Sequence, residues 1–379
     1  MSFFNEVVDR TQTPSEKWNK YKGIDVIPAW VADMDFKSPP CVIEALQKRV
    51  SEGVFGYTSV DDETYAAIIG FIKRHYGWEI RKEWLVFTQG VVSSMNIACM
   101  VIETGSVMTT TPIYPHFIKA PKHAGHEVIA IKMKEENNRW TLDFEAMEAH
   151  ITPTCKLFML CNPYNPAGTV FTCKELEQLG AFCVKHDLTL CSDEIHADLL
   201  LKPEAKHIPI ASLSPALQER TITLMAPSKT FNIAGLQASF AIIPNATLRK
   251  RFKESMGSMV GGINLLGITA MRTAYEKGDA WLAELRLYLA ENLKLVQAFV
   301  AKNPKLKLLE HEATFLAWID ASALHVESPH EFFLEFGVGL SDGEPFGDKN
   351  FVRLNFGTQK NLLEEILKRM QKAMDSLKI

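Results

Sequence analysis

The stretch Thr221-Ile222-Thr223-Leu224-Met225-Ala226-Pro227-Ser228-Lys229 carries a serine and a lysine just beyond a β-branched run. β-Branched residues favour strands, so we expect a strand over 221–225 with Ser228 and Lys229 beyond its end. A lysine that bonds covalently to a carbonyl carbon must first lose its proton, which is easiest where burial and a nearby cation lower its pKa. The stretch is therefore typical of a reactive lysine beside a hydroxyl that would hold a phosphate. Most lysines are solvated, so the surrounding sequence has to support this interpretation.

Short apolar or β-branched runs alternate with helical patterns through the middle of the chain. We expect further strands over residues 85–88, 107–110, 127–131, 156–160, 188–191 and 239–243. Such alternation predicts an α/β fold with a parallel sheet covered by helices. One helix start is marked by Thr172-Cys173-Lys174-Glu175, a capping box in which side chains satisfy the first free amides. That helix should run to about His186.

At 379 residues the chain exceeds the size at which a single hydrophobic core stops growing. We expect a large domain over residues 41–278 and a smaller domain made of residues 1–40 and 279–379. In the smaller domain a long helix is expected over 280–302, with strands over 313–319 and 351–355. Pro28, Pro39 and Pro40 are expected to break the first segment before a helix over 42–49.

Composition excludes several classes of protein. The net charge is −4, with 41 basic against 45 acidic residues and no basic tract, which argues against a nucleic-acid partner. The seven cysteines are odd in number and lack paired CxxC spacing, so we expect reduced thiols and no metal site. Neither a signal-peptide pattern nor an apolar run long enough for a membrane is visible. We therefore expect a cytoplasmic protein with no membrane partner.

Polar residues follow three of the expected strands. Asn162 and Asn165 lie in Asn-Pro-Tyr-Asn-Pro-Ala-Gly (162–168), and Asp193 and His196 lie in Ser-Asp-Glu-Ile-His (192–196). From Asn165 to Asp193 is 28 residues, and from Asp193 to Lys229 is 36, each suitable for one strand-helix-strand crossover. Ligands of open α/β sheets bind beyond the carboxyl ends of the strands. The three segments should therefore meet at one cleft.

These residue types suit the cofactor pyridoxal 5′-phosphate (PLP). A carboxylate such as Asp193 would keep the pyridine nitrogen protonated, so that the ring accepts electrons, while Lys229 would carry the covalent link. Asn165 would donate to the phenolate oxygen of the ring. Tyr114, which follows another expected strand, would stack on the ring.

A phosphate site is expected after the strand over 85–88. Gly90, Val91 and Val92 open an apolar helix there, and they offer bare amides and a helix dipole to a phosphate. Ser228 would add its hydroxyl to the same group.

Each of these residues also has an ordinary structural interpretation. Asp193 or Glu194 would serve as a helix cap, Asn162 and Asn165 would form Asx turns, and His196 would be a core imidazole. Their common spacing and their shared position after strands favour the joint interpretation as a site.

Three motifs resemble the fold-type I PLP enzymes of the class I/II aminotransferase superfamily. They are the segments over 162–168 and 192–196 and Ser-Lys-Thr-Phe-Asn-Ile-Ala-Gly-Leu (228–236). Within that superfamily, Trp-Val-Ala-Asp-Met-Asp-Phe (30–36) resembles the MalY/PatB family of cystathionine β-lyases and cysteine-sulfur lyases. The resemblance spans nearly the whole chain. It implies the aspartate aminotransferase fold, with a mostly parallel seven-stranded sheet in the large domain and a smaller α/β domain.

The resemblance also implies roles for individual residues. Lys229, Asp193 and Tyr114 would be catalytic, and Asn162 and His196 would join the cofactor contacts already named. Arg353, within Phe-Val-Arg-Leu-Asn-Phe-Gly (351–357), would hold the α-carboxylate of an amino-acid substrate beside Trp30 and Ala32. The alternative for Arg353 is a surface cation on a strand, although its apolar neighbours make an unpaired arginine costly. A homodimer is implied, in which Tyr57 reaches the partner's cofactor phosphate.

Two positions depart from the wider superfamily. Its aminotransferases usually carry an arginine eight residues after the lysine and a tyrosine three residues after the aspartate, where this chain has Gln237 and His196. Both changes resemble the lyase branch, although that branch often has histidine in place of Tyr164. The first change leaves the phosphate to Ser228, the Gly90 segment and Tyr57.

The resulting hypothesis is α,β-elimination at the Cβ–S bond of an amino acid such as L-cystathionine, with thiol (homocysteine), pyruvate and ammonia as products. Lys229 would take the α-proton, and either Lys229 or a tyrosine would protonate the departing sulfur. An aminotransferase and a regulatory protein on the same fold remain the alternatives. The choice among sulfur amino acids stays open.

Overall fold

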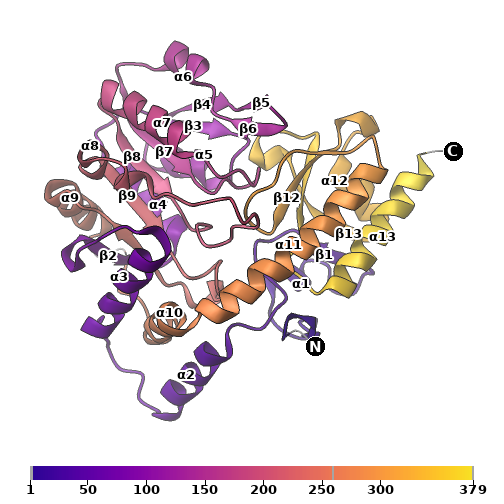
Figure 1. The fold of residues 1–379 in the computed structure, drawn as a ribbon, viewed down its shortest axis with the longest axis horizontal. Helices are drawn as coiled ribbons and strands as arrows, with labels where there is room; N and C mark the ends of the chain where they lie inside the picture. The colour runs from indigo at the N-terminus through magenta and orange to yellow at the C-terminus, as the bar shows by residue number, and fades with distance from the viewer. Residues whose placement is uncertain (1–2, 258–259, 378–379) are drawn as a thin grey trace.

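The computed structural model describes residues 3–257 and 260–377, and its larger sheet has seven strands (Figure 1). The strand order is β2-β10-β9-β8-β7-β3-β4, and β10 runs antiparallel to both of its neighbours while the other pairs are parallel. The strands are β2 (Leu85–Thr88), β3 (Ser106–Thr111), β4 (Glu127–Lys132), β7 (Cys155–Cys161), β8 (Thr189–Asp193), β9 (Thr221–Met225) and β10 (Ser239–Ile242). All seven expected strands are present within two residues of their predicted ends, which confirms the mostly parallel α/β sheet.

Helices connect these strands and cover the sheet. They are α4 (Val91–Met100), α5 (His116–His123), α6 (Phe144–His150), α7 (Cys173–Lys185), α8 (Pro215–Gln218) and α9 (Ala246–Met256). The start of α7 confirms the capping box, because the Glu175 amide donates to Thr172 Oγ1 at 3.3 Å and the Thr172 amide donates to Glu175 Oε2 at 2.7 Å. A two-stranded hairpin, β5 (Lys134–Glu136) and β6 (Arg139–Thr141), precedes α6.

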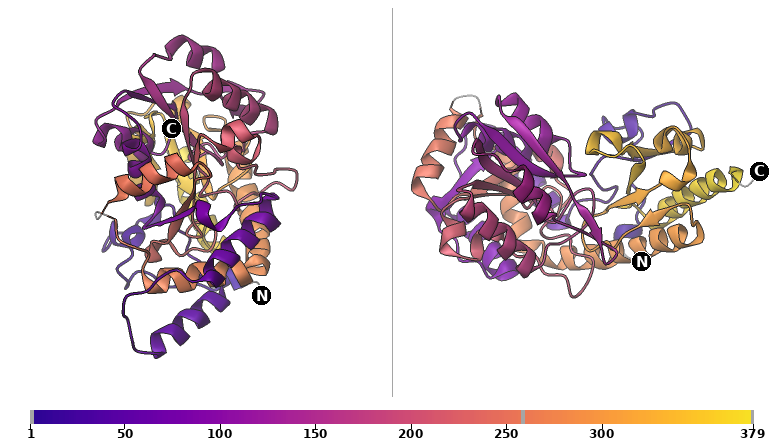
Figure 2. Two further views of the ribbon diagram at one scale, coloured as in Figure 1. Left: turned by 90° about the vertical axis from the view of Figure 1, so that its left-hand side faces the viewer. Right: turned by 90° about the horizontal axis from the view of Figure 1, so that it is seen from above.

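A second sheet joins the two ends of the chain. Its order is β1 (Ile27–Ala29), β13 (Val338–Asp342), β14 (Phe351–Asn355), β12 (Leu316–Asp320) and β11 (Lys307–Leu308). The expected break at Pro28 is wrong, because Pro28 is the middle residue of β1, opposite Gly339. β1 is an edge strand, where a proline without an N–H is tolerated. Viewed from above, this sheet and the larger one form separate lobes (Figure 2), although the domain boundaries at residues 40 and 278 stay a prediction.

The remaining helices flank or join the two sheets. They are α1 (Glu16–Asn19), α2 (Pro40–Ser51), α3 (Asp62–Tyr76), α10 (Leu265–Lys277), α11 (Asp279–Lys302), α12 (Pro329–Glu335) and α13 (Lys360–Ser376). Short 3-10 helices lie at Phe3–Asn5, Lys82–Trp84, Ile210–Ser212, Ala234–Leu236, Ser322–Leu324 and Glu344–Phe346. No helix in the described ranges combines the length and apolar character that a membrane crossing requires.

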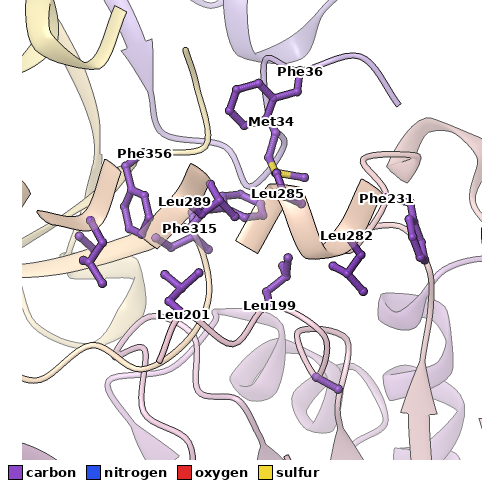
Figure 3. Packing of buried hydrophobic residues seen from close by; sticks show 14 of the residues in the cluster. Met34, Phe36, Leu199, Leu201, Phe231, Leu282, Leu285, Leu289, Phe315 and Phe356 are labelled. Carbon is purple, nitrogen blue, oxygen red and sulfur yellow. The ribbon is translucent and has the colours of Figure 1, made fainter. Parts of the chain in front are cut away.

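Helix α11 fixes one sheet relative to the other. Leu282, Leu285 and Leu289 recur at helical spacing on one face, and they belong to a buried cluster with side chains from both ends of the chain, including Phe36 and Phe356 (Figure 3). Full burial of each leucine contributes about 1.5–3 kcal/mol. This shared core holds the small sheet beside the strand ends of the large sheet.

Candidate active site

The carboxyl ends of six strands share one edge of the large sheet, because β4 is parallel to β3, and the other five strands precede residues of the site. β3, β7, β8 and β9 are parallel, and β2 has the same direction as β9 because β10 runs antiparallel to both. A cavity of about 750 Å³, called here the active-site cavity, lies at this edge. It brings together twelve of the predicted site residues: Trp30, Ala32, Gly90, Val91, Val92, Tyr114, Asn165, Asp193, His196, Ser228, Lys229 and Arg353.

Lys229 lies beyond the end of β9, and its Nζ donates to the Ala32 carbonyl at 2.6 Å. Its pKa is lowered to about 8, chiefly by burial and also by the Arg353 charge, although the charges of Asp33 and Asp193 act in the opposite direction. A solvated lysine has a pKa of about 10.4. A substantial fraction of the Lys229 amine is therefore neutral near pH 8, as formation of a covalent link requires.

Asp193 is the last residue of β8 and is buried. Its Oδ1 accepts a hydrogen bond from the Ile195 amide at 3.1 Å. The pKa of this carboxyl is raised to about 7, chiefly by burial and also by the neighbouring Glu194 charge, although the Ile195 amide and the Lys229 charge act in the opposite direction. A protonated pyridine nitrogen beside Asp193 would supply the cation that favours the carboxylate. The site therefore fits the ring of PLP.

Arg353 lies on β14 with only 5% of its surface exposed, so the surface-cation alternative is wrong. Nη1 donates to Asn165 Oδ1 at 2.9 Å, and Nη2 donates to the Trp30 carbonyl at 2.9 Å and to Ser341 Oγ at 3.3 Å. Within the described ranges, Nε has no hydrogen-bond partner and the guanidinium has no acidic partner. Burial lowers its pKa to about 10. A carboxylate bound here would compensate the buried charge.

The start of α4 offers a phosphate site. Gly90 has a φ of +88°, a conformation that glycine tolerates, and a Cβ built on it would meet no atom within 4 Å. The first amides of a helix lack intrahelical acceptors, so Val91 and Val92 present free donors there. Ser228 and Gln237 line the same cavity. Bare amides, a hydroxyl and a carboxamide together fit the phosphate of PLP.

Tyr114, after β3, and His196, three residues after Asp193 at the end of β8, also line the active-site cavity. Tyr114 is half-buried, and burial raises the pKa of its phenol. His196 is buried, and burial lowers the pKa of its imidazole to about 3, so the ring stays neutral. Its Nδ1 has no hydrogen-bond partner among the residues that the structure describes. The cavity therefore contains an orphaned polar atom available to a ligand.

Asn162 and Tyr57 do not line this cavity, although the Asn162 amide donates to the carbonyl of the lining residue Asp193 at 3.0 Å. Asn162 is buried after β7, where its Oδ1 accepts from the Phe171 amide at 3.2 Å, so a contact with the cofactor stays a prediction. Tyr57 is fully exposed between α2 and α3 and lines a separate surface hollow with Phe55. Its predicted role needs a second copy of the chain.

Several supporting residues lack any sequence signal of their role. The Asn355 side chain donates to the carbonyls of Val31 and Asp33 at 2.6 and 2.7 Å. Asp35 is buried and accepts from Lys17 Nζ at 2.6 Å and from Arg10 Nη1 at 2.9 Å. These contacts fix the segment whose Ala32 carbonyl meets Lys229. Both residues lie within quoted motifs, Asp35 in 30–36 and Asn355 in 351–357, but neither motif shows which distant atoms these side chains contact.

Comparisons with known proteins agree with this geometry. A family model described as aminotransferase class I and II matches residues 28–370. The chain is 37% identical to cystathionine beta-lyase PatB of Bacillus subtilis, over 98% of this chain and 99% of that protein. It is 45% identical to the crystal structure of OvoB, with a TM-score of 0.97, covering 99% and 100% of the two chains. Cystalysin from Treponema denticola, a structure that contains pyridoxal 5′-phosphate, is 33% identical with a TM-score of 0.94 and full coverage of both chains.

Proposed function

Because this chain belongs to the class I and II aminotransferase family, with PLP as its cofactor, we propose that it is a carbon-sulfur β-lyase. Its substrate would be L-cystathionine or a related cysteine S-conjugate, and its products a thiol, pyruvate and ammonia. The observation that carries the lyase assignment is the 37% identity, over almost the whole chain, with a cystathionine β-lyase. Gln237 and His196, which replace the usual aminotransferase residues, support the same assignment.

Different residues of the active-site cavity would perform different tasks in the reaction. Bound PLP would supply an acceptor for the electron pair left on the substrate α-carbon. Arg353 would hold the α-carboxylate, and Asp193 would stay ionised beside the ring nitrogen. Lys229 would take the α-proton on Nζ, and a base with a pKa near 8 suits that task at neutral pH.

Departure of the thiol completes the elimination. The Cβ–S bond breaks with its electron pair on sulfur, which then takes a proton from Lys229 or Tyr114. The remaining three-carbon fragment reacts with water and gives pyruvate and ammonia. Both Lys229 and Tyr114 line the cavity in which the sulfur would lie.

An assay without an acceptor acid tests this function against aminotransferase activity. We expect the PLP-loaded protein to release pyruvate and free thiol in equal amounts from L-cystathionine alone. Turnover that requires 2-oxoglutarate and yields glutamate would instead identify an aminotransferase and would contradict the proposal.

Arg353→Lys is expected to raise KM for the amino-acid substrate by about tenfold to a hundredfold. Lysine keeps the charge but loses the planar fork that grips a carboxylate and the contact with Asn165. Steady-state kinetics on L-cystathionine measure the effect, with the exposed Arg251→Lys as the control. An unchanged KM would remove Arg353 from carboxylate binding.

We also propose a homodimer in which Tyr57 reaches the partner's cofactor phosphate. Val54, Phe55 and Tyr57 form a run of exposed apolar residues between α2 and α3, as is common at protein interfaces. Mixing the Tyr57→Ala and Lys229→Ala variants under conditions that exchange subunits should restore activity, because one site of each mixed dimer is then intact. A mixture as inactive as its two components would show that Tyr57 does not act across an interface.

A further inference from the structure

Among the described residues, six charged side chains line the active-site cavity, and two of them have neither a role in the proposed reaction nor a hydrogen-bond or ion-pair partner. Lys229, Asp193 and Arg353 have roles in that reaction. Asp342 already has a hydrogen bond, because its Oδ1 accepts from the Glu344 amide at 3.1 Å in the turn after β13. The other two are Glu16 and Lys20, both exposed to solvent at the cavity. Across residues 3–257 and 260–377, neither forms an ion pair or a side-chain hydrogen bond. Both charges are therefore available to a ligand.

Trp30 connects Lys20 to the arginine of the site. Lys20 Nζ lies 4.7 Å from the centroid of the Trp30 ring, a cation–π contact, and Trp30 Nε1 donates to the Lys17 carbonyl at 3.1 Å. At its other end, the Trp30 carbonyl accepts from Arg353 Nη2 at 2.9 Å. An amino acid held by Arg353 would thus extend along Trp30, with its far end near Lys20.

Glu16 places an opposite charge in the same part of the cavity. It lies four residues before Lys20 in the α1 segment, and residues four apart lie on the same helical face. Its charge also acts on Tyr114, where it raises the pKa of the phenol. One acidic and one basic group therefore lie beside the aromatic residues Trp30 and Tyr114.

We propose that Glu16 and Lys20 bind the far end of the leaving thiol, so that this chain prefers thioethers whose thiol portion carries both an ammonium and a carboxylate. Lys20 would pair with the carboxylate and Glu16 with the ammonium. The inference rests on the proposed lyase activity and specifies which of the possible cysteine S-conjugates this chain prefers. Sulfur conjugates with an uncharged thiol portion would lack both contacts.

Four cysteine thioethers of similar length test this subsite. L-Cystathionine carries both charges, S-(3-carboxypropyl)-L-cysteine only the carboxylate, S-(3-aminopropyl)-L-cysteine only the ammonium, and S-propyl-L-cysteine neither. With the PLP-loaded protein, kcat/KM for cystathionine is expected to exceed that for S-propyl-L-cysteine by about tenfold, since each partly exposed pair contributes a few-fold. The difference should appear mainly in KM and should shrink at high salt.

Two variants test the contributions of Lys20 and Glu16 separately, and a third variant, which keeps the positive charge, serves as the control. Lys20→Met is expected to lower kcat/KM about threefold to fivefold for cystathionine and the carboxypropyl compound, and to leave the other two substrates unchanged. Glu16→Gln should affect cystathionine and the aminopropyl compound instead, while Lys20→Arg should retain the wild-type preference. Turnover of all four substrates without these differences would overturn the subsite and leave the lyase activity intact. Absence of pyruvate from all four would overturn the lyase activity and the subsite with it.

Discussion

Lys229→Ala is expected to lower pyruvate release from L-cystathionine by about a thousandfold or more. The variant loses both the covalent anchor of the cofactor and the base that takes the α-proton, and general-base catalysis alone contributes about 10²- to 10⁴-fold. Lys20, the other lysine that lines the cavity, is exposed and contacts the ring of Trp30, so it does not replace Lys229. A coupled assay that follows pyruvate measures the loss.

A matched lysine controls for nonspecific effects of this change. Lys305 is exposed and lies outside the active-site cavity, so Lys305→Ala should keep wild-type activity. Melting temperatures of both variants show whether the fold is retained. A folded Lys229→Ala protein with turnover near that of the wild type would remove Lys229 from the mechanism.

Asp193→Asn is expected to lower kcat by about two hundredfold to five thousandfold, equivalent to the ~3–5 kcal/mol cost of breaking a buried ion pair. A neutral amide would no longer favour the protonated ring nitrogen, so the cofactor would accept electrons less well. Steady-state kinetics at saturating PLP measure the fall in kcat. The exposed Asp187→Asn serves as the control. Wild-type kcat in the Asp193 variant would contradict the assigned role.

Although Asp193→Asn should lower activity, it should stabilise the cofactor-free protein against unfolding above neutral pH. The Asp193 pKa is raised to about 7 in the folded protein, against about 3.9 in an unfolded chain. The free energy of unfolding therefore falls as the pH rises from about 4 to 7, because the unfolded chain releases this proton first. At pH 8, the Asn variant without cofactor should melt at a higher temperature than the wild type. A loss of activity caused by misfolding would come with a lower melting temperature.

The sequence predicted the large sheet and most of the site because both depend on local patterns. β2 and β9 begin and end at the predicted residues, since each is a short apolar or β-branched run bounded by polar or turn residues. Asn165, Asp193 and Lys229 meet in one cavity because the strands before them are parallel neighbours. The strand direction alone places these side chains at one edge.

The features that the sequence did not predict depend on contacts between distant segments of the chain. Pro28 forms part of a strand only because β13, some 310 residues later, pairs with it at a sheet edge. Asn355 and Asp35 act through backbone carbonyls and through an ion cluster, and neither leaves a spacing pattern. Glu16 and Lys20 belong to a short helical segment whose place at the cavity depends on the contact of Lys17 with Trp30.

We expect Lys229 to carry the covalent link to PLP in the cavity that Asp193 and Arg353 also line. Reduction of the PLP-loaded protein with borohydride, followed by digestion and peptide mass analysis, identifies the lysine that carries the cofactor. We expect the added mass of one pyridoxyl phosphate group on the peptide that contains Lys229. The same mass on another lysine, or on no peptide of a protein that had bound PLP, would contradict it.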